Sequence, residues 1–511
     1  MSTAIRIAEL EQQNTLLSAQ LEVLQRQLDW FKRQLFGAKS EKQLLIDPAV
    51  QGNLLAALGV ATPSPPPITA TTTVTYTRKK LRDNTVTDSG LRFDATVPVN
   101  TILIGDPAIE ALPASERECI GEKVTYRLAQ RPASYELMKY IRRVYKITAS
   151  QTIVTTVAPP TVLDKCAADV SLLAGLLTDK FLYHLPLYRQ HQRITAAGIQ
   201  VSRSSLTNWS SRAIDLLAPI YAAQFSHVLL SRVLAMDETP IKAGRREKGK
   251  LRQCYFWPIY GQDNEVVFPF ATSRAHSHVP NLLGTFTGTL LSDGYEAYAA
   301  YARNNTAVTH AECWAHCRRH FEGAKEAEPA AVADALALIG ALYRHEEIIR
   351  DTHLEGEQKR AYRTAHSEPV VQTFWCWCDE QCHRPDLLPG NPLSKALKYA
   401  RERRVSLQVF LSDPEVPVDT NHLERALRPI PMGRRNWLFC WTELGAKQVG
   451  IIQSLIATCK LHGVDVYTYL VDILQRVSQH PAKDVIDLTP RVWKTKFAHD
   501  PIRSDIALAD Q

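Results

Sequence analysis

The sequence is poor in cysteine for its length and has no long apolar run. Its ten cysteines in 511 residues are too dilute and too irregularly spaced for a disulfide framework, so we expect a reducing compartment. No apolar segment approaches the roughly 18 residues that a membrane-spanning helix needs. The first residues, Met1 to Arg6, lead into a polar helix, and we expect no signal peptide. These absences exclude a secreted disulfide-rich scaffold and a membrane protein.

The remaining composition is that of a folded protein with several domains. Apolar residues make up 45 % of the chain and charged residues 22 %. A chain of this length is sufficient for about three or four domains. The formal net charge is +7, which suits an anionic partner but does not prove one, because the charge could be spread evenly over the surface.

The first 46 residues predict a coiled coil, because apolar residues recur at alternating steps of three and four. One seam contains Ile7, Asn14, Leu21, Leu28 and Leu35, and the other contains Leu10, Leu17, Leu24 and Phe31. A buried amide at Asn14 would fix the register of a dimer, so we expect self-association through this helix. The alternative is a helix that packs on the chain's own core. Residues 47–77 are rich in proline and threonine and predict a disordered linker.

Short alternating runs follow the linker. Residues 78–165 open with a basic cluster and contain strand-like segments such as 123–128 and 140–146. Alternation of apolar and polar residues over this length is typical of strands. We therefore expect a small β-rich region here.

Residues 166–227 predict a helix-turn-helix. Pro186 stands where one helix begins, a glycine-containing turn follows, and Ser202 can cap a second helix. Arg203 and Arg212 on that second helix are candidate contacts to DNA. Plain helical packing is the alternative interpretation.

Two apolar strands each end in a carboxylate. Residues 233–236 form a continuous apolar run, typical of a strand buried on both faces, and Asp237 and Glu238 follow it. A buried carboxylate is costly unless it binds something positive. Because side chains alternate along a strand, we expect Asp237 and Glu238 to point to opposite faces, so that only one of them enters a site. A second apolar strand, 289–292, ends in Asp293 in the same way.

The segment between these two strands predicts further sheet structure. Residues 253–260 and 266–270 are expected strands, because they are rich in aromatic and β-branched residues. Residues 244–250 are basic and predict an exposed connecting loop.

Two clusters of cysteine and histidine are weaker metal candidates. The first contains Cys313, His316, Cys317 and His320. It fits within one helix and has no distant second pair, and the neighbouring Arg318 and Arg319 would repel a cation. The second contains Cys376, Cys378, Cys382 and His383. It lies in a block, 325–413, whose apolar spacing predicts helices, so packed cysteines are the favoured interpretation.

A third acid lies in a short helix late in the chain. Asp419 or Thr420 can cap this helix, Pro429 ends it, and Glu424 and Arg428 lie four residues apart on it. Alone, such a pair is usually a surface salt bridge. Together with the two strand-end carboxylates, a third acid would attract two divalent cations, which clamp the attacking and leaving oxygens of a phosphoryl transfer. Oxygen ligands favour Mg²⁺ or Mn²⁺.

In their order and spacing, these motifs resemble the transposases of the bacterial insertion-sequence 66 family, the large TnpC-type subunit. The matching segments are Gln34–Glu41, Leu185–Gln190, Met236–Pro240, Ser292–Tyr295, Cys313–His316 and Glu424–Pro429. The resemblance implies an α/β fold with a ribonuclease H-like core and an all-helical insertion. It also implies an Asp-Asp-Glu triad in which Asp237, Asp293 and Glu424 are the catalytic residues and the ligands of two Mg²⁺ or Mn²⁺ ions.

The same resemblance suggests how the second half of the chain is divided. The expected core comprises residues 228–326 and 414–462, interrupted by the helical insertion at 327–413. A C-terminal helix and tail are expected at 463–511.

The sequence departs from the family pattern in two places. Family members often carry cysteine pairs between the linker and the helix-turn-helix, whereas this sequence has only Cys119 and Cys166 there. We therefore expect no zinc site in that region. Asp419, Thr420 and Asn421 stand where the family usually has Asp-Asn-Asn, which leaves Asp419 as the alternative third ligand.

The resulting hypothesis is a cytoplasmic, nucleoid-associated DNA transposase. It would bind double-stranded DNA at the terminal inverted repeats of an insertion sequence, cleave a strand, and join the freed 3′-hydroxyl to target DNA. Arg425, Arg428 and Arg434 are candidate contacts to the DNA backbone. Residues expected to support the site are His316, Cys313 and Asn421. Companion proteins of the same element are further candidate partners. The alternatives are a catalytically silent DNA-binding or assembly factor of the element and a ribonuclease H-like nuclease.

Overall fold

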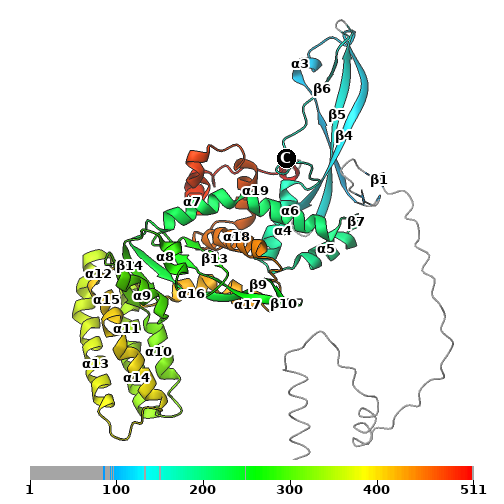
Figure 1. Cartoon of the computed structure of the whole chain (residues 1–511). Coiled ribbons are helices and arrows are strands. Elements are labelled where there is room, and N and C mark those ends of the chain that lie inside the picture. The colour runs from blue at the N-terminus through cyan, green and yellow to red at the C-terminus, as the bar shows by residue number, and fades with distance from the viewer. Residues whose placement is uncertain are drawn as a thin grey trace, which may run out of the picture. The chain divides into compact units, whose positions relative to one another are not determined.

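The computed structural model describes residues 97–131, 134–148, 151–247 and 249–508, together with 85–86, 92–93 and 95 (Figure 1). The predicted coiled coil at 1–46 and the predicted linker at 47–77 lie outside the described residues. Residues Leu81–Gln511 group into one compact unit. The finer division of this unit into domains therefore remains a prediction.

A long antiparallel hairpin dominates the β-rich region. Its strands are β4 (Arg117–Arg131) and β5 (Ser134–Ile147). Strand β3 (Val99–Ile104) pairs in parallel with β5, and β6 (Ile153–Thr155) pairs with it antiparallel. A short helix, α3 (Pro107–Glu110), follows β3. The strands predicted at 123–128 and 140–146 are confirmed, and both extend further because the hairpin pairing continues along most of their length.

The two helices predicted within residues 166–227 are confirmed. The elements of this region are α4 (Val170–Phe181), α5 (Leu187–Ala196), α6 (Arg203–Leu216) and α7 (Ala218–Val228). Ser202 caps α6 by accepting a hydrogen bond from the backbone N–H of Ser205 at 3.0 Å. Gly198 lies between the helices with φ +82°, a conformation that glycine adopts readily.

A small sheet lies beside these helices. It consists of β1 (Thr85–Val86), β2 (Arg92–Phe93) and β7 (Ile199–Gln200), and β7 belongs to the segment between α5 and α6. Strand β7 pairs with β2, so the segment that connects α5 and α6 contacts residues more than a hundred positions earlier in the chain.

The described residues form a mixed five-stranded sheet with β8 (Val233–Met236) at its centre. All four residues of β8 are buried, as predicted for a strand that is covered on both faces. On one side, β14 (Gly288–Ser292) runs parallel to β8 and β15 (Val308–Glu312) runs parallel to β14. On the other side, β11 (Ile259–Tyr260) and β12 (Val266–Val267) continue the sheet in antiparallel order.

The expected basic loop at 244–250 is mostly strand, so that prediction was wrong. Strands β9 (Thr239–Glu247) and β10 (Lys250–Phe256) form an antiparallel hairpin, to which β13 (Phe270–Ala271) adds. The positive charge of residues 244–250 indicated an exposed loop, but pairing between the two strands determines the secondary structure of such a hairpin. The expected strand at 253–260 is likewise divided into β10 and β11 by Trp257 and Pro258, since proline cannot donate to a strand ladder.

Helices cover the sheet and form the predicted helical block. Helices α8 (His278–Leu283), α9 (Glu296–Asn304) and α10 (Trp314–Glu322) accompany the parallel strands. The block that follows contains α11 (Pro329–Asp351), α12 (Gly356–Tyr362), the π-helical turn η1 (Arg363–Ser367), α13 (Glu368–Cys382), α14 (Pro392–Glu402) and α15 (Arg404–Ser412). Arg363 is fully buried here and pairs with Glu346 through two hydrogen bonds of 2.8 and 2.7 Å.

The chain then returns to the sheet through α16 (Asn421–Leu427), α17 (Pro429–Gly433) and α18 (Glu443–Leu461). Gly450 of α18 packs closely on the sheet segment, because a Cβ there would lie 2.3 Å from the carbonyl oxygen of Phe268. The C-terminal region is α19 (Val466–Arg476), η2 (Ala482–Leu488), α20 (Pro490–Lys496) and α21 (Asp505–Leu508). The expectation of one helix and a tail was therefore wrong, because these short helices are fixed by contacts to distant residues.

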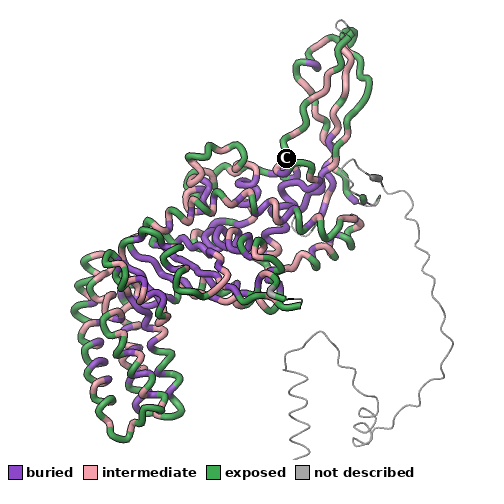
Figure 2. The backbone as a smooth tube through the Cα atoms, viewed as in Figure 1, coloured by how far each residue is buried: buried purple, intermediate pink, exposed green. Residues whose placement is uncertain are grey.

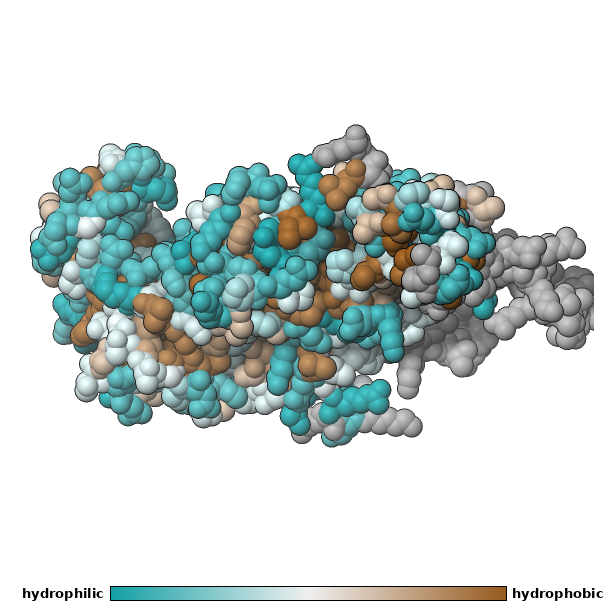
Figure 3. Space-filling view, turned by 90° about the horizontal axis from the view of Figure 1, so that it is seen from above, coloured by the Kyte–Doolittle hydropathy of each residue, from teal (hydrophilic) through white to brown (hydrophobic). Residues whose placement is uncertain are grey.

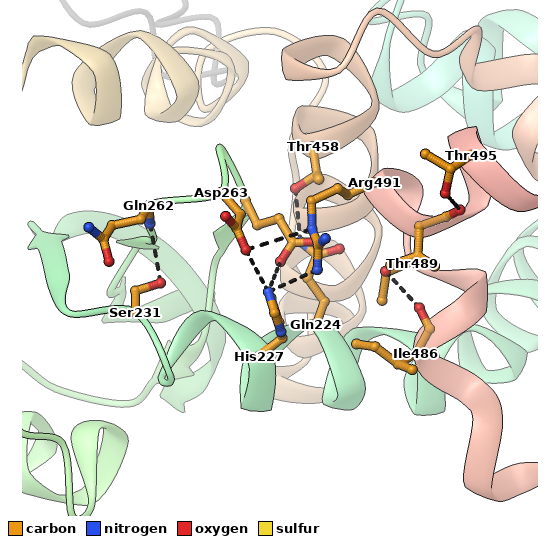
Figure 4. Close-up of polar contacts among 12 residues, drawn as sticks. Gln224, His227, Ser231, Gln262, Asp263, Thr458, Ile486, Thr489, Arg491 and Thr495 are labelled. Atoms are coloured by element: carbon orange, nitrogen blue, oxygen red, sulfur yellow. Dashed lines mark hydrogen bonds and ion pairs between the residues drawn. The ribbon is translucent and has the colours of Figure 1, made fainter. Parts of the chain in front are cut away.

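Figure 4 shows how α20 is held against α7 and the turn before β12. Arg491 donates to Glu265 at 3.2 Å, and the His227 ring lies 2.8 Å from a carboxylate oxygen of Asp263. In the same view, Gln224 donates to the hydroxyl of Thr458 on α18 at 2.8 Å. These contacts join α20 and α18 to the edge of the sheet.

The largest apolar core extends from α4 and α6 along one face of the sheet and α18 into the helical block. Figure 2 shows buried residues concentrated along the central elements, whereas the helical block and the long hairpin carry more exposed positions. The face seen in Figure 3 is mainly hydrophilic, with small hydrophobic areas between polar side chains. Among the described residues, no helix has the length and apolar character needed to cross a membrane.

Candidate active site

Three carboxylates converge where two parallel strands end. Asp237 and Glu238 directly follow β8, and Asp293 directly follows β14. Because β8 and β14 are parallel neighbours, their carboxyl ends meet at the same edge of the sheet. Ligand atoms of the three side chains all lie within 4.8 Å of one another, and no other such set of three occurs among the described residues. The arrangement can bind a divalent cation through oxygen.

The prediction that only one of Asp237 and Glu238 enters a site was wrong. Strand β8 ends at Met236, so the alternation of side chains no longer holds for the two acids that follow. Both carboxylates reach the space beside Asp293.

Glu238 is held by two neighbours. Arg274 donates to Oε1 from Nε at 2.7 Å and also from its terminal nitrogen, and the hydroxyl of Tyr298 donates to Oε2 at 2.7 Å. The side chain is only 3 % exposed. Burial raises the pKa of Glu238, and the hydrogen bonds from Tyr298 and Arg274 counteract this effect. Both carboxylate oxygens of Glu238 are therefore already engaged by the protein.

The Asp237 carboxylate is largely buried beside several other negative charges. Burial first, and then the nearby charges of Asp293, Glu238 and Glu424, raise the pKa of Asp237 to about 7. The one hydrogen bond to its carboxylate among the described residues comes from the backbone N–H of Glu238 at 2.7 Å. A cation placed here would relieve the repulsion and favour the ionised carboxylate.

Asp293 lies in a loop that is fixed from two sides. Its Oδ1 accepts a hydrogen bond from the backbone N–H of Tyr295 at 2.9 Å. Arg403, at the end of α14, donates to the carbonyl oxygen of Gly294 at 3.1 Å. A Cβ at Gly294 would lie 2.7 Å from the hydroxyl oxygen of Tyr399, so only glycine allows this close approach.

The proposed third acid, Glu424, lies on α16 next to the cluster but not within it. Its Oε1 is 3.6 Å from His316 Nε2 and 3.4 Å from a terminal nitrogen of Arg319, and the side chain is 32 % exposed. The contribution of Glu424 to the pKa of Asp237 indicates that the two carboxylates are electrostatic neighbours. The structure thus brings Asp237 and Asp293 together and places Glu424 against His316 and Arg319.

The residues expected to support the site join α10 to α16. Cys313, just before α10, accepts hydrogen bonds through its sulfur from the backbone N–H and the hydroxyl of Thr420, both at 3.3 Å. This contact connects the helix that carries His316 with the helix that carries Glu424. Burial lowers the pKa of His316, which favours its neutral form.

The carboxylate of Asp419, the alternative third ligand, accepts hydrogen bonds within its own turn. It accepts hydrogen bonds from the backbone N–H of Asn421 at 2.9 Å and from the side-chain amide of Asn421 at 2.5 Å. Asp419 is buried and does not belong to the set of three carboxylates. The contacts favour a role for Asp419 and Asn421 in shaping the start of α16.

Sequence reasoning missed a second acidic position beside the site. Glu312 ends β15, the third parallel strand, and burial raises its pKa to about 8 even though Arg403 Nε lies 3.3 Å away. The position of Glu312 at the end of a strand was a signal that could have found it. Arg403 could not be found in this way, because it reaches the site from 109 positions beyond Gly294.

The arginines predicted to contact DNA differ in whether their side chains already bind to the protein itself. Arg203, Arg425 and Arg428 are exposed. Arg212 donates to the carbonyl oxygen of Asp164 at 3.1 Å, and Arg434 donates to that of Pro240 at 2.7 Å. The last two side chains therefore also stabilise the fold.

Together, the mixed sheet and its strand-end carboxylates define an α/β protein with a candidate divalent-cation site. Comparison with known families is consistent with this class. The profile described as "Transposase IS66 family" matches residues 165–448, and the profile described as "IS66 C-terminal element" matches residues 454–491. The chain belongs to the IS66 transposase family, which confirms the resemblance that the motifs indicated.

Similar proteins occur in Sinorhizobium fredii (strain NBRC 101917 / NGR234). The chain is 27 % identical to uncharacterized protein y4jD over 513 residues, covering 96 % of this chain and 98 % of that protein. It is 28 % identical to uncharacterized protein y4hP over 399 residues, covering 74 % of this chain and 72 % of that protein. The likeness to y4jD thus extends over nearly the full length of both chains.

Proposed function

We propose that this transposase cleaves DNA at the terminal inverted repeats of its insertion sequence and joins the freed 3′-hydroxyl to target DNA. Membership of the IS66 transposase family supports a transposase role and DNA as the partner. The observation that carries the chemical proposal is the meeting of Asp237 and Asp293 at the ends of adjacent parallel strands.

The sheet supports a ribonuclease H-like core for this chemistry. Three strands, β8, β11 and β12, run antiparallel in sequence order, and β14 and β15 then add in parallel on the other side of β8. In such a sheet the first and second acids follow adjacent strands. A helical block then separates them from the third acid, as the resemblance implies.

The carboxylates fit a divalent cation. Asp237 and Asp293 each accept one backbone hydrogen bond among the described residues, so each retains a carboxylate oxygen for an ion. When bound, two Mg²⁺ or Mn²⁺ ions would stabilise the attacking and leaving oxygens of a phosphoryl transfer.

We propose Glu424 as the third acid of the triad. Glu238 is closer to the two aspartates, but Arg274 and Tyr298 already engage its oxygens. Glu424 is only partly engaged, by His316 and Arg319, and it is more exposed. In this proposal neutral His316 and cationic Arg319 orient the Glu424 carboxylate, while Glu238 fixes Arg274 and Tyr298 at the base of the site.

DNA would be held by exposed arginines on two of the helices. The exposed face of α6 carries Arg203, and α16 with the residue after it carries Arg425 and Arg428. These guanidinium groups suit phosphate contacts, which fix the register of a protein on DNA. Self-association through the N-terminal heptad and companion proteins of the same element remain part of the proposal.

The test is strand cleavage by the Asp237→Asn variant of the full chain. The substrate is a plasmid that carries both ends of the element, and nicking is followed with Mg²⁺ or Mn²⁺ present. We expect the nicking rate to fall on the order of 100-fold or more, because the amide removes a ligand charge. Asp334→Asn, the same change at an exposed position on α11, is the matched control and should cleave like the wild type.

The outcomes separate the alternatives. Undiminished nicking by Asp237→Asn would rule out Asp237 as a catalytic residue. Specific binding of the ends without any metal-dependent nicking by the wild type would favour a silent assembly factor. Nicking without joining to a target would favour a nuclease.

A further inference from the structure

Two large aromatic side chains lie exposed on the segment between α17 and α18. Phe439 is 61 % exposed and Trp441 is 70 % exposed. Large aromatic side chains dominate core and interface energetics, and adjacent exposed ones mark candidate interaction surfaces. The neighbouring residues Trp437 and Cys440 are buried, so the outward position of the two rings is a specific feature of this segment.

The segment is held firmly by its inward-facing residues. The ring of Trp437 stacks on His184 with centroids 4.7 Å apart and packs edge-on against Phe181. Cys440 forms a parallel bridge with Ala243 of β9, and both residues are buried. Because successive side chains of an extended segment point to opposite sides, burial of Cys440 directs Phe439 and Trp441 outward.

Two basic residues lie near this segment, one across the bridge and one four positions before Phe439 in the chain. In the register set by the bridge between Ala243 and Cys440, Lys242 lies beside Phe439, and it is exposed. Arg435 is also exposed, and neither Lys242 nor Arg435 forms an ion pair among the described residues. We name Lys242, Arg435, Phe439 and Trp441 the aromatic–basic patch.

Strand β9 connects the patch to the acidic site. Strand β9, which carries Lys242, begins at Thr239, directly after Asp237 and Glu238. Arg434 donates to the carbonyl oxygen of Pro240 at 2.7 Å, which joins the segment to the start of that strand. Helices α17 and α18 both contact β9 (Figure 1). Lys242 therefore lies at most about 17 Å along an extended strand from Asp237, within reach of a DNA strand held at the acids.

We propose that Phe439 and Trp441 stack on unpaired bases of a DNA strand whose backbone is contacted by Lys242 and Arg435. This inference rests on the proposed function and specifies the form of DNA that the site receives. Aromatic rings stack on bases of any sequence when the bases are unstacked, and a basic groove tracks the backbone. In an intact duplex the base faces are hidden, so the rings would have no partner there. A purely apolar protein partner is disfavoured by the unpaired lysine and arginine.

The experiment measures DNA affinity by fluorescence anisotropy with the full chain in EDTA, so that no cleavage occurs. The probes are a blunt duplex and the same duplex with a single-stranded 3′ overhang. We expect Trp441→Ala to raise the Kd for the overhang probe about tenfold and to change the Kd for the blunt probe less than about twofold. Phe439→Ala should act in the same direction.

Two variants control for other causes. Trp441→Tyr keeps an aromatic face and should retain most of the overhang affinity. Leu444→Ala removes a side chain that is 60 % exposed in the same stretch but cannot stack, so it should leave both affinities unchanged. Because Trp441 is exposed, its variants should melt at the wild-type temperature, which circular dichroism would verify.

Several results would overturn the proposal. Equal weakening on both probes would indicate a general phosphate contact, and unchanged affinity would indicate no contact with bases. A smaller oligomer for Trp441→Ala in light scattering would identify a second copy of the chain as the occupant. Failure of the wild type to bind either probe would overturn the proposed function as well. Wild-type binding and cleavage with unchanged Trp441→Ala affinity would overturn this inference alone.

Discussion

Arg403 donates a hydrogen bond to the carbonyl oxygen of Gly294 at 3.1 Å and so connects the helical block to the loop that carries Asp293. The guanidinium also lies 4.0 Å over the ring of Tyr399 and 3.3 Å from a carboxylate oxygen of Glu312. The helical block therefore helps to fix the acidic site. Arg403 acts here as a positioning residue.

Replacing this side chain tests the connection. We expect Arg403→Ala to weaken Mn²⁺ binding by roughly tenfold, because residues that orient metal ligands typically contribute this much. Isothermal titration calorimetry of the full chain would measure the affinity. Arg401→Ala, on the same helix but directed to Asp379 at 3.7 Å, is the control. Equal Mn²⁺ affinity for wild type and Arg403→Ala would show that the loop holds its position without the arginine.

The third acid can be assigned by paired substitutions. Glu424→Gln should lower Mn²⁺ affinity about tenfold or more and nearly abolish nicking, because it removes a proposed ligand. Glu238→Gln should change Mn²⁺ affinity by less than about threefold, since Arg274 and Tyr298 already bind that carboxylate. Calorimetry and the nicking assay together measure both effects. The reverse ranking would assign Glu238 as the third ligand.

The raised pKa of Asp237, about 7, predicts a pH-dependent stability in the absence of divalent cations. Between the pKa of the unfolded chain, near 4, and this value, the folded state binds more protons than the unfolded state. Stability contributed by this group is therefore present at low pH and is lost as pH rises toward 7. The Asp237→Asn variant does not titrate there and should gain roughly 4 kcal/mol relative to wild type between pH 4 and pH 8, because a change of one in pKa corresponds to about 1.4 kcal/mol. Chemical denaturation at several pH values, with and without Mg²⁺, would measure the difference. A constant offset across pH would contradict the assignment.

The buried pair of Arg363 and Glu346 predicts a large stability effect far from the acids. Arg363 is fully buried, pairs with Glu346, and also donates to the carbonyl oxygens of Phe410 and Val416 at 2.7 and 3.0 Å. Arg363→Met would leave Glu346 without its partner and should destabilise the chain by roughly 3 to 5 kcal/mol. Arg360→Met, at an exposed position one turn away, should change stability by less than about 0.5 kcal/mol. Denaturant unfolding curves measure both.

Part of this architecture was predictable because it depends on local signals. The apolar run at 233–236 predicted a buried strand. Because β8 and β14 are parallel neighbours, the acids that follow these two strands meet at one edge of the sheet. The boundaries of α5 and α6 followed from Pro186 and Ser202, whose effects act within one turn. The helical character of the block after α10 followed from apolar spacing.

Other features depend on contacts between distant residues. The entry of Glu238 into the site follows from where β8 ends, and periodicity does not fix such an end to within one residue. Arg274 and Arg403 reach the acids from segments 36 and 109 positions away, so no local pattern indicates them. The strand residues at 239–247 and 250–252 were missed because the charged residues there pair across a hairpin rather than forming a solvated loop.

The central claim is that Asp237 and Asp293 together bind a divalent cation. Anomalous X-ray diffraction from crystals soaked with Mn²⁺ tests it most directly. The account predicts an anomalous peak coordinated by a carboxylate oxygen from each of these two residues, with Glu424 turned toward it. A Mn²⁺ peak coordinated elsewhere, with both aspartates free of metal, would contradict the account.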